Sequence, residues 1–301
     1  MSMHRIRYSP THEGGFTLME LLVSMTISSI TMAMVVGGAL TFRNTYSTDV
    51  VRTRTNGNLR SGMDIISMNI RQAGENLLST FPAVLLTNAS GSTSDVLTLR
   101  RGLIPEVLTL CADAASSTTT LFVSSADGLN SECVFSNVTP LYTIFNNLRD
   151  DEGGSLRLYI YDKVAHLGEY VNFTAGSSIT GQYQLSTSAL TRAYPRLNTS
   201  IYLIEEYQFS FDSAERELVL LRDGDDEVPR PVAFDITQFA VSIEVEDGTT
   251  ITSLSAGDET DWKDISQIVI SLSGNGSYKG HTMSSTISAK FFPRNVLSYE
   301  G

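Results

Sequence analysis

The sequence predicts an α+β protein in which a long N-terminal helix packs on a body of antiparallel β-sheet. Three observations predict this class. Residues 16–42 form a run of 27 residues with a single charge, which is typical of a membrane-spanning helix. Residues 59–77 place apolar side chains at helical spacing. From about residue 83 the apolar pattern changes to a period of two, which indicates strands with one face in solvent.

The apolar run is long enough to cross a bilayer. At 1.5 Å per residue it reaches roughly 40 Å, against about 30 Å of hydrocarbon. Arg5 and Arg7 precede the run, and basic flanks favour the cytoplasmic side, so we expect the body on the outer side. A secretory signal has a shorter apolar core with small residues after it. Here the small residues, Gly14 and Gly15, come first, so cleavage there leaves the helix on the mature chain.

Glu20 is the single charged residue of this run. A carboxylate inside a spanning helix costs roughly 2.5–3.5 kcal/mol on insertion scales, and such residues tend to be functional. If the chain is cut after Gly15, Phe16 carries a free ammonium, which reaches its own Glu20 only awkwardly. In a staggered stack of similar helices, the carboxylate of one subunit can meet the amine of another. Because an unpaired buried charge is costly, this pairing would fix the axial register between subunits.

The segment GGFTLMELLV resembles the class III leader and N-terminus of type IV pilins and type II secretion pseudopilins. In these families a prepilin peptidase cuts after the glycine and methylates the new N-terminal residue, usually phenylalanine. The resemblance implies that residues 1–15 are a leader, with Gly14 and Gly15 before the cut. It also implies that Phe16 is N-methylated and that Glu20 serves assembly. Methylation keeps the positive charge of the amine, so the pairing argument holds for the processed chain.

The helical pattern continues over residues 43–80 as an amphipathic helix. Its apolar face consists of Leu59, Met63, Ile66, Ile70, Ala73 and Leu77. Its polar side consists of Arg60, Asp64, Asn69, Arg71 and Glu75. We expect the apolar face to pack on the sheet and the pattern to end at Pro82.

The remaining residues, 81–301, are expected to form the antiparallel β body. Strands are predicted over residues 95–100, 155–162, 202–212, 216–223, 236–247 and 265–274. The glycine-rich stretch SGNGSYKG is interpreted as a hairpin rather than a phosphate loop. The body is about twice as long as one pilin sheet requires, so we expect two β subdomains.

Within the pilin class, SGMDIISMNIRQAGENL resembles PilW-like minor pilins and J-type pseudopilins, in which a helix ends in an Arg-Gln-Ala-Gly-like motif, here Arg71 to Gly74. The resemblance extends to a tyrosine-rich strand and hairpin, here Tyr202 to Arg222. It also includes a late Phe-x-x-Arg, here Phe291 to Arg294. The length fits PilW-like proteins better than the shorter J-type ones.

The two cysteines, Cys111 and Cys133, are separated by 21 residues. In an exported protein such a pair is expected to form a disulfide, worth roughly 3 kcal/mol in the chain-entropy model. The alternative is two unpaired buried thiols, as expected if the body is cytoplasmic. The spacing fits no zinc pattern.

A calcium ion is the single cofactor that the sequence offers, in the acidic loop RDGDDEVP. Asp223, Asp225, Asp226 and Glu227 supply hard oxygen ligands of the kind that Ca²⁺ accepts. Some pseudopilins bind calcium in such loops. The spacing is not that of an EF-hand, and a solvated turn between strands is the commoner interpretation.

Charge and motifs argue against several other classes. The formal net charge of -12 is opposite to that of a nucleic-acid binder. No G-x-S-x-G, H-E-x-x-H or P-loop motif occurs, so the sequence predicts no enzyme.

The sequence therefore predicts a structural minor pilin that takes part in the initiation and tip assembly of a type IV pilus. A large β body repeated along a shaft would crowd its neighbours. The expected place is the bacterial inner membrane, as a single-pass protein with a periplasmic body, and then the cell-surface pilus. Expected partners are other minor and major pilins, the prepilin peptidase, the inner-membrane assembly machinery and, before assembly, the lipid bilayer.

Two alternatives stay open. One is a J-type pseudopilin of a type II secretion system. The other is a tip adhesin, for which Tyr183, Tyr194 and Trp262 are candidate binding aromatics, although each is also explained by packing.

Overall fold

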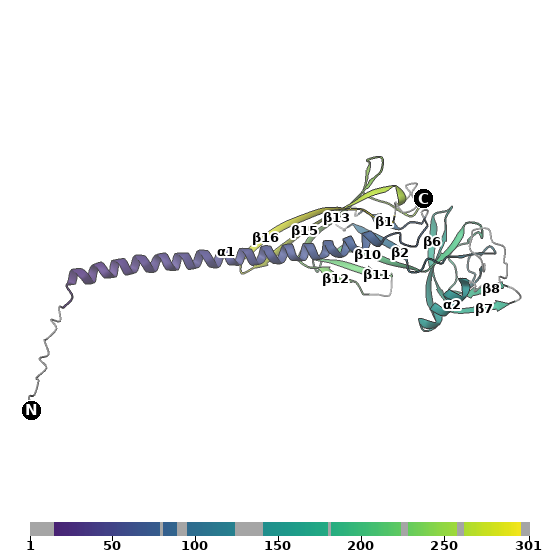
Figure 1. The fold of residues 1–301 in the computed structure, drawn as a ribbon, viewed down its shortest axis with the longest axis horizontal. Coiled ribbons are helices and arrows are strands. Elements are labelled where there is room, and N and C mark those ends of the chain that lie inside the picture. Colours follow the sequence, from purple (N-terminus) through teal and green to yellow (C-terminus); the bar gives the residue numbers. More distant parts are fainter. Residues whose placement is uncertain are drawn as a thin grey trace, which may run out of the picture.

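The computed structural model describes residues 15–78, 81–88, 95–123, 141–179, 182–223, 228–257 and 262–295. Figure 1 shows an elongated molecule, in which the long helix α1 (Leu18–Gln72) projects from a β body that covers only its second half. The predicted α+β class is confirmed, because the remaining elements are mainly strands in antiparallel sheets.

The described strands form four sheets. One has the order β1 (Val84–Thr87), β2 (Val96–Gly102), β10 (Ile204–Asp212), β11 (Glu217–Arg222), β12 (Arg230–Ala233). A second has the order β14 (Thr250–Ile251), β13 (Ile236–Val245), β15 (Ile265–Tyr278), β16 (His281–Phe291). A third has the order β3 (Leu108–Thr109), β9 (Thr199–Tyr202), β5 (Leu156–Asp162), β6 (Leu167–Phe173). The fourth has the order β4 (Thr120–Val123), β8 (Gln182–Ser186), β7 (Ala175–Ile179). Two short helices, α2 (Leu141–Asp151) and the 3-10 helix η1 (Trp262–Asp264), complete the described elements.

Two hydrophobic clusters divide the body into two lobes. The first cluster lies between α1 and the two larger sheets, which together we call the proximal lobe (residues 47–102 and 204–295). The second lies among the third and fourth sheets and α2, which we call the distal lobe (residues 103–203). Figure 1 places the distal lobe at the end farthest from the N-terminus. This arrangement agrees with the two β subdomains expected from the length of the body.

The first half of α1 is bare in the single chain. Every residue from Gly15 to Tyr46 is exposed, including Leu18 at 81% and Met34 at 72%. Hydroxyl side chains of this stretch donate to carbonyls three or four residues earlier: Ser24, Thr26, Ser29, Thr31 and Thr41. Their polar groups are thereby satisfied within the helix. The result is an apolar surface without a partner in one chain.

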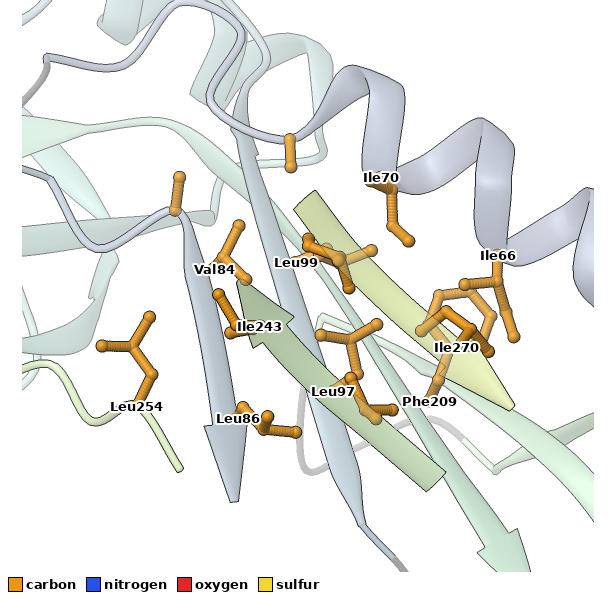
Figure 2. Packing of buried hydrophobic residues seen from close by; sticks show 14 of the residues in the cluster. Ile66, Ile70, Val84, Leu86, Leu97, Leu99, Phe209, Ile243, Leu254 and Ile270 are labelled. Carbon is orange, nitrogen blue, oxygen red and sulfur yellow. The ribbon is translucent and has the colours of Figure 1, made fainter. Parts of the chain in front are cut away.

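The second half of α1 packs on β15 and β16, with smaller contacts to β12 and β2. The predicted apolar face is buried, and Figure 2 shows Ile66 and Ile70 directed at Leu97 and Leu99 of β2 and at Ile270 of β15. Burial of such a face, rather than intrinsic propensity, supplies most of a helix's stability in a protein.

One residue of this pattern was assigned to the wrong side. Asn69, expected on the polar side, is 5% exposed, and its amide donates to the carbonyl of Ile65 at 2.9 Å. This bond along the helix satisfies a polar group that the packing covers.

Gly62 allows α1 to lie close to the sheets. A Cβ at this position would lie 3.0 Å from Cβ of Ala233 and 3.2 Å from Cδ2 of Leu272. A helical glycine costs about 1 kcal/mol relative to alanine. Here the close approach of the backbone offsets that cost, because a side chain would push the helix away from its core.

The helix ends at Gln72, eight residues before the bound expected at residue 80. Ala73 leaves the helical region with a ψ of 135°, although its N–H still donates to the carbonyl of Asn69. Gly74 follows with a φ of 82°, and its N–H donates to the carbonyl of Arg100 at 2.9 Å. The Arg-Gln-Ala-Gly motif thus ends the helix and joins it to β2, and Pro82 comes after the turn.

The distal lobe is an insertion into a single strand pair. β2 and β10 are hydrogen-bonded antiparallel neighbours, and Gly102 pairs with Ile204 at their shared end. Residues 103–203 connect these two positions, and the N–H of Leu103 donates to the carbonyl of Leu203 at 2.9 Å. The two ends of the insertion are therefore adjacent, as in tolerated domain insertions.

An aromatic cluster packs at the junction of the two lobes. The ring of Phe81, fully buried, lies 5.6 Å from that of Tyr159, 5.0 Å from Tyr161 and 4.9 Å from Tyr202. The guanidinium of Arg100 sits 5.0 Å above the Tyr159 ring. Edge-on ring pairs and a cation over a ring are both favourable, so this cluster fixes the distal lobe against the proximal one.

Ion pairs across β2 and β10 complete the junction. Arg100 donates to Glu206 at 2.6 Å, and Arg101, on the opposite face of the strand, pairs with Glu205. Arg101 also donates to the side chain of Gln72, which links the end of α1 to the sheet. Burial alone would raise the pKa of the Glu205 carboxyl, but the bonds from Arg101 and the nearby Arg222 hold it below its ordinary value.

We expect Glu205→Gln to lower the free energy of unfolding by about 2 kcal/mol at pH 7, because it removes the charge of a buried carboxylate to which Arg101 and the more exposed Arg222 donate. A depressed folded-state pKa contributes stability above the unfolded-state pKa and loses it as the pH falls through the folded value. The deficit of the variant should therefore shrink below about pH 4. Urea unfolding in detergent, followed by the fluorescence of Trp262, measures the free energy of unfolding of each variant. The control is Glu215→Gln, at an exposed acid that makes no ion pair with another described residue. Equal behaviour of the two variants would contradict the prediction.

Candidate functional site: the N-terminal segment of α1

The segment around the predicted cleavage point lies at the free end of α1. Gly15, Phe16 and Thr17 precede the helix, and Phe16 is 87% exposed. Gly14 lies outside the described residues. Thr17 is the N-cap residue, with extended backbone angles of φ -76° and ψ 148°. The bond between Gly15 and Phe16 is therefore two residues outside the first helical turn.

Glu20 and Thr17 form a reciprocal capping box. The hydroxyl of Thr17 accepts from the N–H of Glu20 at 3.2 Å. In return, Oε2 of Glu20 accepts from the N–H of Thr17 at 3.0 Å and from its hydroxyl at 2.9 Å. Such a box satisfies backbone N–H groups that a helix start leaves without partners. Because the positive end of the helix dipole lies here, it also stabilises a negative side chain in the first turn.

This box gives Glu20 a partner that the sequence analysis missed. The signal was present as Thr-x-x-Glu immediately before an apolar run, which is the capping-box pattern. Both Thr17 bonds go to Oε2. Among the described residues, no hydrogen bond reaches Oε1, so the carboxylate can hold its own helix start and accept another donor.

α1 is also the one described helix that is long and apolar enough to cross a membrane. Its most apolar window has a mean hydropathy of 1.8, close to the N-terminus. Glu20 lies about one turn inside this span, where a charge near the headgroups costs less than one at the centre. The capped helix start and the apolar stretch after it thus form one continuous segment.

A comparison with protein-family models found one match. Residues 10–36 match the model of the prokaryotic N-terminal methylation motif. The chain carries a prepilin-type leader. This match supports a type IV pilin-like or pseudopilin-like protein, and with the apolar α1 it fits a protein anchored in the inner membrane. A leader of this kind implies that the pilin-like chain meets a prepilin peptidase and the pilus machinery. A search of the curated proteins and a search of the solved structures each found no match.

The predicted disulfide stays a prediction. Cys111 is buried at 4% exposure beside β4, and its N–H donates to the carbonyl of Phe122 at 3.0 Å. Cys133 lies outside the described residues.

The calcium proposal is also untested. Asp225, Asp226 and Glu227 lie outside the described residues. The carboxylate of Asp223 accepts from the N–H of Glu206 at 2.9 Å and from Arg222 at 3.2 Å. Among the described residues no group of three acids, histidines or cysteines could hold a metal ion. Asp223 therefore serves the junction between β10 and β11.

The three candidate binding aromatics are buried. Tyr194 is fully buried, Trp262 is 4% exposed and Tyr183 is 8% exposed. Tyr183 stacks on Tyr142 of α2 with ring centroids 4.7 Å apart, and Trp262 packs against Gly74. All three belong to the packing of the lobes, not to an exposed aromatic patch.

A cavity of about 490 Å³ opens where the lobes meet. Leu103, Leu203 and Leu148 of the distal lobe form part of its apolar wall, and Arg157 and Asp223 line its polar part. Its size is that of a small-molecule site. Its acidic lining residues are Glu152 and Asp223, and neither a histidine nor a cysteine is among the lining residues.

Thr17→Ala should destabilise the first turn of α1 by about 1 kcal/mol, because it removes the hydroxyl that accepts from the N–H of Glu20 and donates to its Oε2. Amide hydrogen exchange of residues 18–21 in detergent should then be about five times faster, since about 1 kcal/mol corresponds to that factor in an opening equilibrium. Thr17→Ser keeps the hydroxyl and serves as the control. Identical exchange in all three chains would show that the box contributes nothing to the helix start.

Proposed function

We propose that the chain is a PilW-like minor pilin that takes part in the initiation and tip assembly of a type IV pilus. The observation that carries the proposal is the capped Glu20 at the start of a helix whose first half is bare in the single chain. A helix of this kind needs lipid before assembly and other helices afterwards. The prepilin-type leader supports the same assignment.

The proposed mechanism begins with cleavage between Gly15 and Phe16 and methylation of the new amine. Thr17 keeps its amide N–H after this cut, so the capping box survives processing. Oε1 of Glu20 can then accept the charged amine of a neighbouring subunit while Oε2 stays bonded to Thr17. Charge-assisted bonds in a dry environment are strong and geometrically demanding. Docking would therefore set the axial stagger, and helix packing would hold the filament core.

The position of the distal lobe supports a place at the start of the filament. In Figure 1 this lobe extends past the end of α1, on the side away from the N-terminus. A subunit in the middle of a shaft has neighbours on that side, whereas a terminal subunit has none. The lobe, with its own core and the periplasmic exposure expected of the body, therefore favours the initiating complex.

The PilW-like subtype rests on the Arg71–Gly74 motif. In this chain the motif ends α1, and Gly74 joins the helix to Arg100 of β2. A J-type pseudopilin of a secretion system would share the leader, and the two are separated by whether the chain is recovered from surface filaments or from secretion assemblies. The burial of Tyr183, Tyr194 and Trp262 leaves the adhesin alternative without a supporting patch.

Processing gives the first test. Mass spectrometry of the chain from the native host should find a mature N-terminus at Phe16 with one added methyl group. Gly15→Leu should leave the full leader attached, because the bulky side chain blocks the peptidase, while Gly15→Ala serves as a small-residue control. A wild-type chain that retains residues 1–15 would overturn the pilin assignment.

Glu20 gives the second test, because two substitutions separate its two roles. Glu20→Gln keeps an acceptor for the capping box but removes the charge, since glutamine also closes such boxes. We expect it to lower recovery in sheared filaments about ten-fold or more, as Glu20→Ala does, if pairing with an amine sets the register. Immunoblots of the filament and membrane fractions measure the effect. Wild-type recovery for Glu20→Gln with loss for Glu20→Ala would mean that Glu20 acts only as a cap.

A further inference from the structure

The solvent face of the second half of α1 carries a set of arginines without acidic partners. All five are exposed: Arg43, Arg52, Arg54, Arg60 and Arg71. None makes an ion pair with another described residue. Asp49 and Asp64 lie in the same stretch, so the segment 43–72 keeps three net positive charges. Exposed charges that find no partner among the described residues are available to another chain.

Helical spacing arranges four of these arginines in two lines. Arg43 and Arg54 are eleven residues apart, as are Arg60 and Arg71. Eleven residues are close to three turns, or roughly 16 Å along the helix. The opposite side of α1 is occupied by β15 and β16. The lines therefore flank a face that the described body leaves open, on which Met68 is 56% exposed.

The rest of the chain has the opposite charge. Residues 73–301 contain 14 lysines and arginines against 29 aspartates and glutamates. Exposed acids occur in both lobes, among them Asp113, Asp150, Asp235 and Asp247. A basic helix face and an acidic body on one polypeptide are complementary when one subunit's helix lies beside another subunit's body.

We propose that this arginine face of α1 is a docking surface for the acidic body of a neighbouring pilin-type subunit. The contact is heterologous, because it joins different surfaces of two subunits and so can continue along a stack. It rests on the proposed function and adds to it a second determinant beyond Glu20. Complementary charge guides orientation and encounter more than it adds raw affinity, so the arginine face selects the neighbour while the apolar half of α1 holds it.

Distance argues against anionic lipid as the occupant. If the membrane segment ends at residue 42, Arg54 lies roughly 18 Å and Arg60 roughly 27 Å farther along the helix. The Debye length at physiological salt is about 8 Å. Headgroups can therefore attract Arg43 but not the arginines beyond it.

The test uses the full chain in its native host, with paired charge reversals. Arg54→Glu with Arg60→Glu should lower recovery in filaments about ten-fold relative to the amount inserted in the membrane. The matched control is Arg192→Glu with Arg196→Glu, which makes the same charge change at exposed arginines of the distal lobe and should leave recovery unchanged. Equal recovery for both double variants would overturn the proposal.

A second variant identifies the partner without removing charge. The double variant Arg54→Lys with Arg60→Lys should assemble normally. Treatment of its filaments with a carbodiimide should then form an amide bond between a new lysine amine and a carboxylate that contacts it directly. Mass spectrometry should place that carboxylate on the body of a pilin-type subunit, and 0.5 M salt should reduce the product. Normal assembly of the lysine variant without any such product would overturn the docking surface. So would a charge-reversed chain whose only defect is weaker membrane insertion, because that is the result expected for lipid contacts. Absence of the wild-type chain from filaments would instead contradict the proposed function itself.

Discussion

The constraint on which the structure depends is the apolar surface of the first half of α1. In a single chain this stretch is exposed from Gly15 to Tyr46, and water is an unfavourable environment for so much hydrocarbon. The helix satisfies its own backbone and most of its hydroxyl groups, so lipid or other helices can surround it. A lipid bilayer and a bundle of other helices are two solutions of the same physical problem.

Glu20 is the one charged side chain of residues 16–42 on this otherwise apolar surface. Its bonds to Thr17 stabilise the carboxylate in one isolated chain, so it needs no second subunit while the helix lies in a membrane. Its second oxygen leaves room for a donor from outside. The arginine face of α1 has the same character farther along the helix, because its charges are solvated in the monomer and complementary to acidic surface elsewhere. In the proposed assembly, electrostatics at these two features selects the neighbour and packing of the apolar helix retains it.

The body divides its work between its two lobes. The proximal lobe holds the main contacts of α1 with the sheets, and Gly62 brings the helix close to it. The distal lobe enters through one strand pair at Gly102 and Ile204, and the aromatic cluster around Phe81 keeps it in place. The helix-bearing unit and the inserted unit each have a hydrophobic cluster, and Tyr159, Tyr161 and Tyr202 of the inserted unit belong to the cluster of the helix-bearing one.

The sequence by itself determined the elements whose signal is local. The apolar run, the stripe from Leu59 to Ile70 and the alternation in β13 and β15 depend only on the helical and strand periods, and the structure has them as expected. Ala73 and Leu77 are buried as expected, but they lie past the end of the helix. The capping box was equally local, as Thr17 to Glu20, and was readable. Tertiary structure alone decided the burial of Asn69, the insertion of residues 103–203 between paired strands, and the ion pairs of Arg101 with Glu205. These depend on which distant segments meet, and no short-range pattern encodes that pairing.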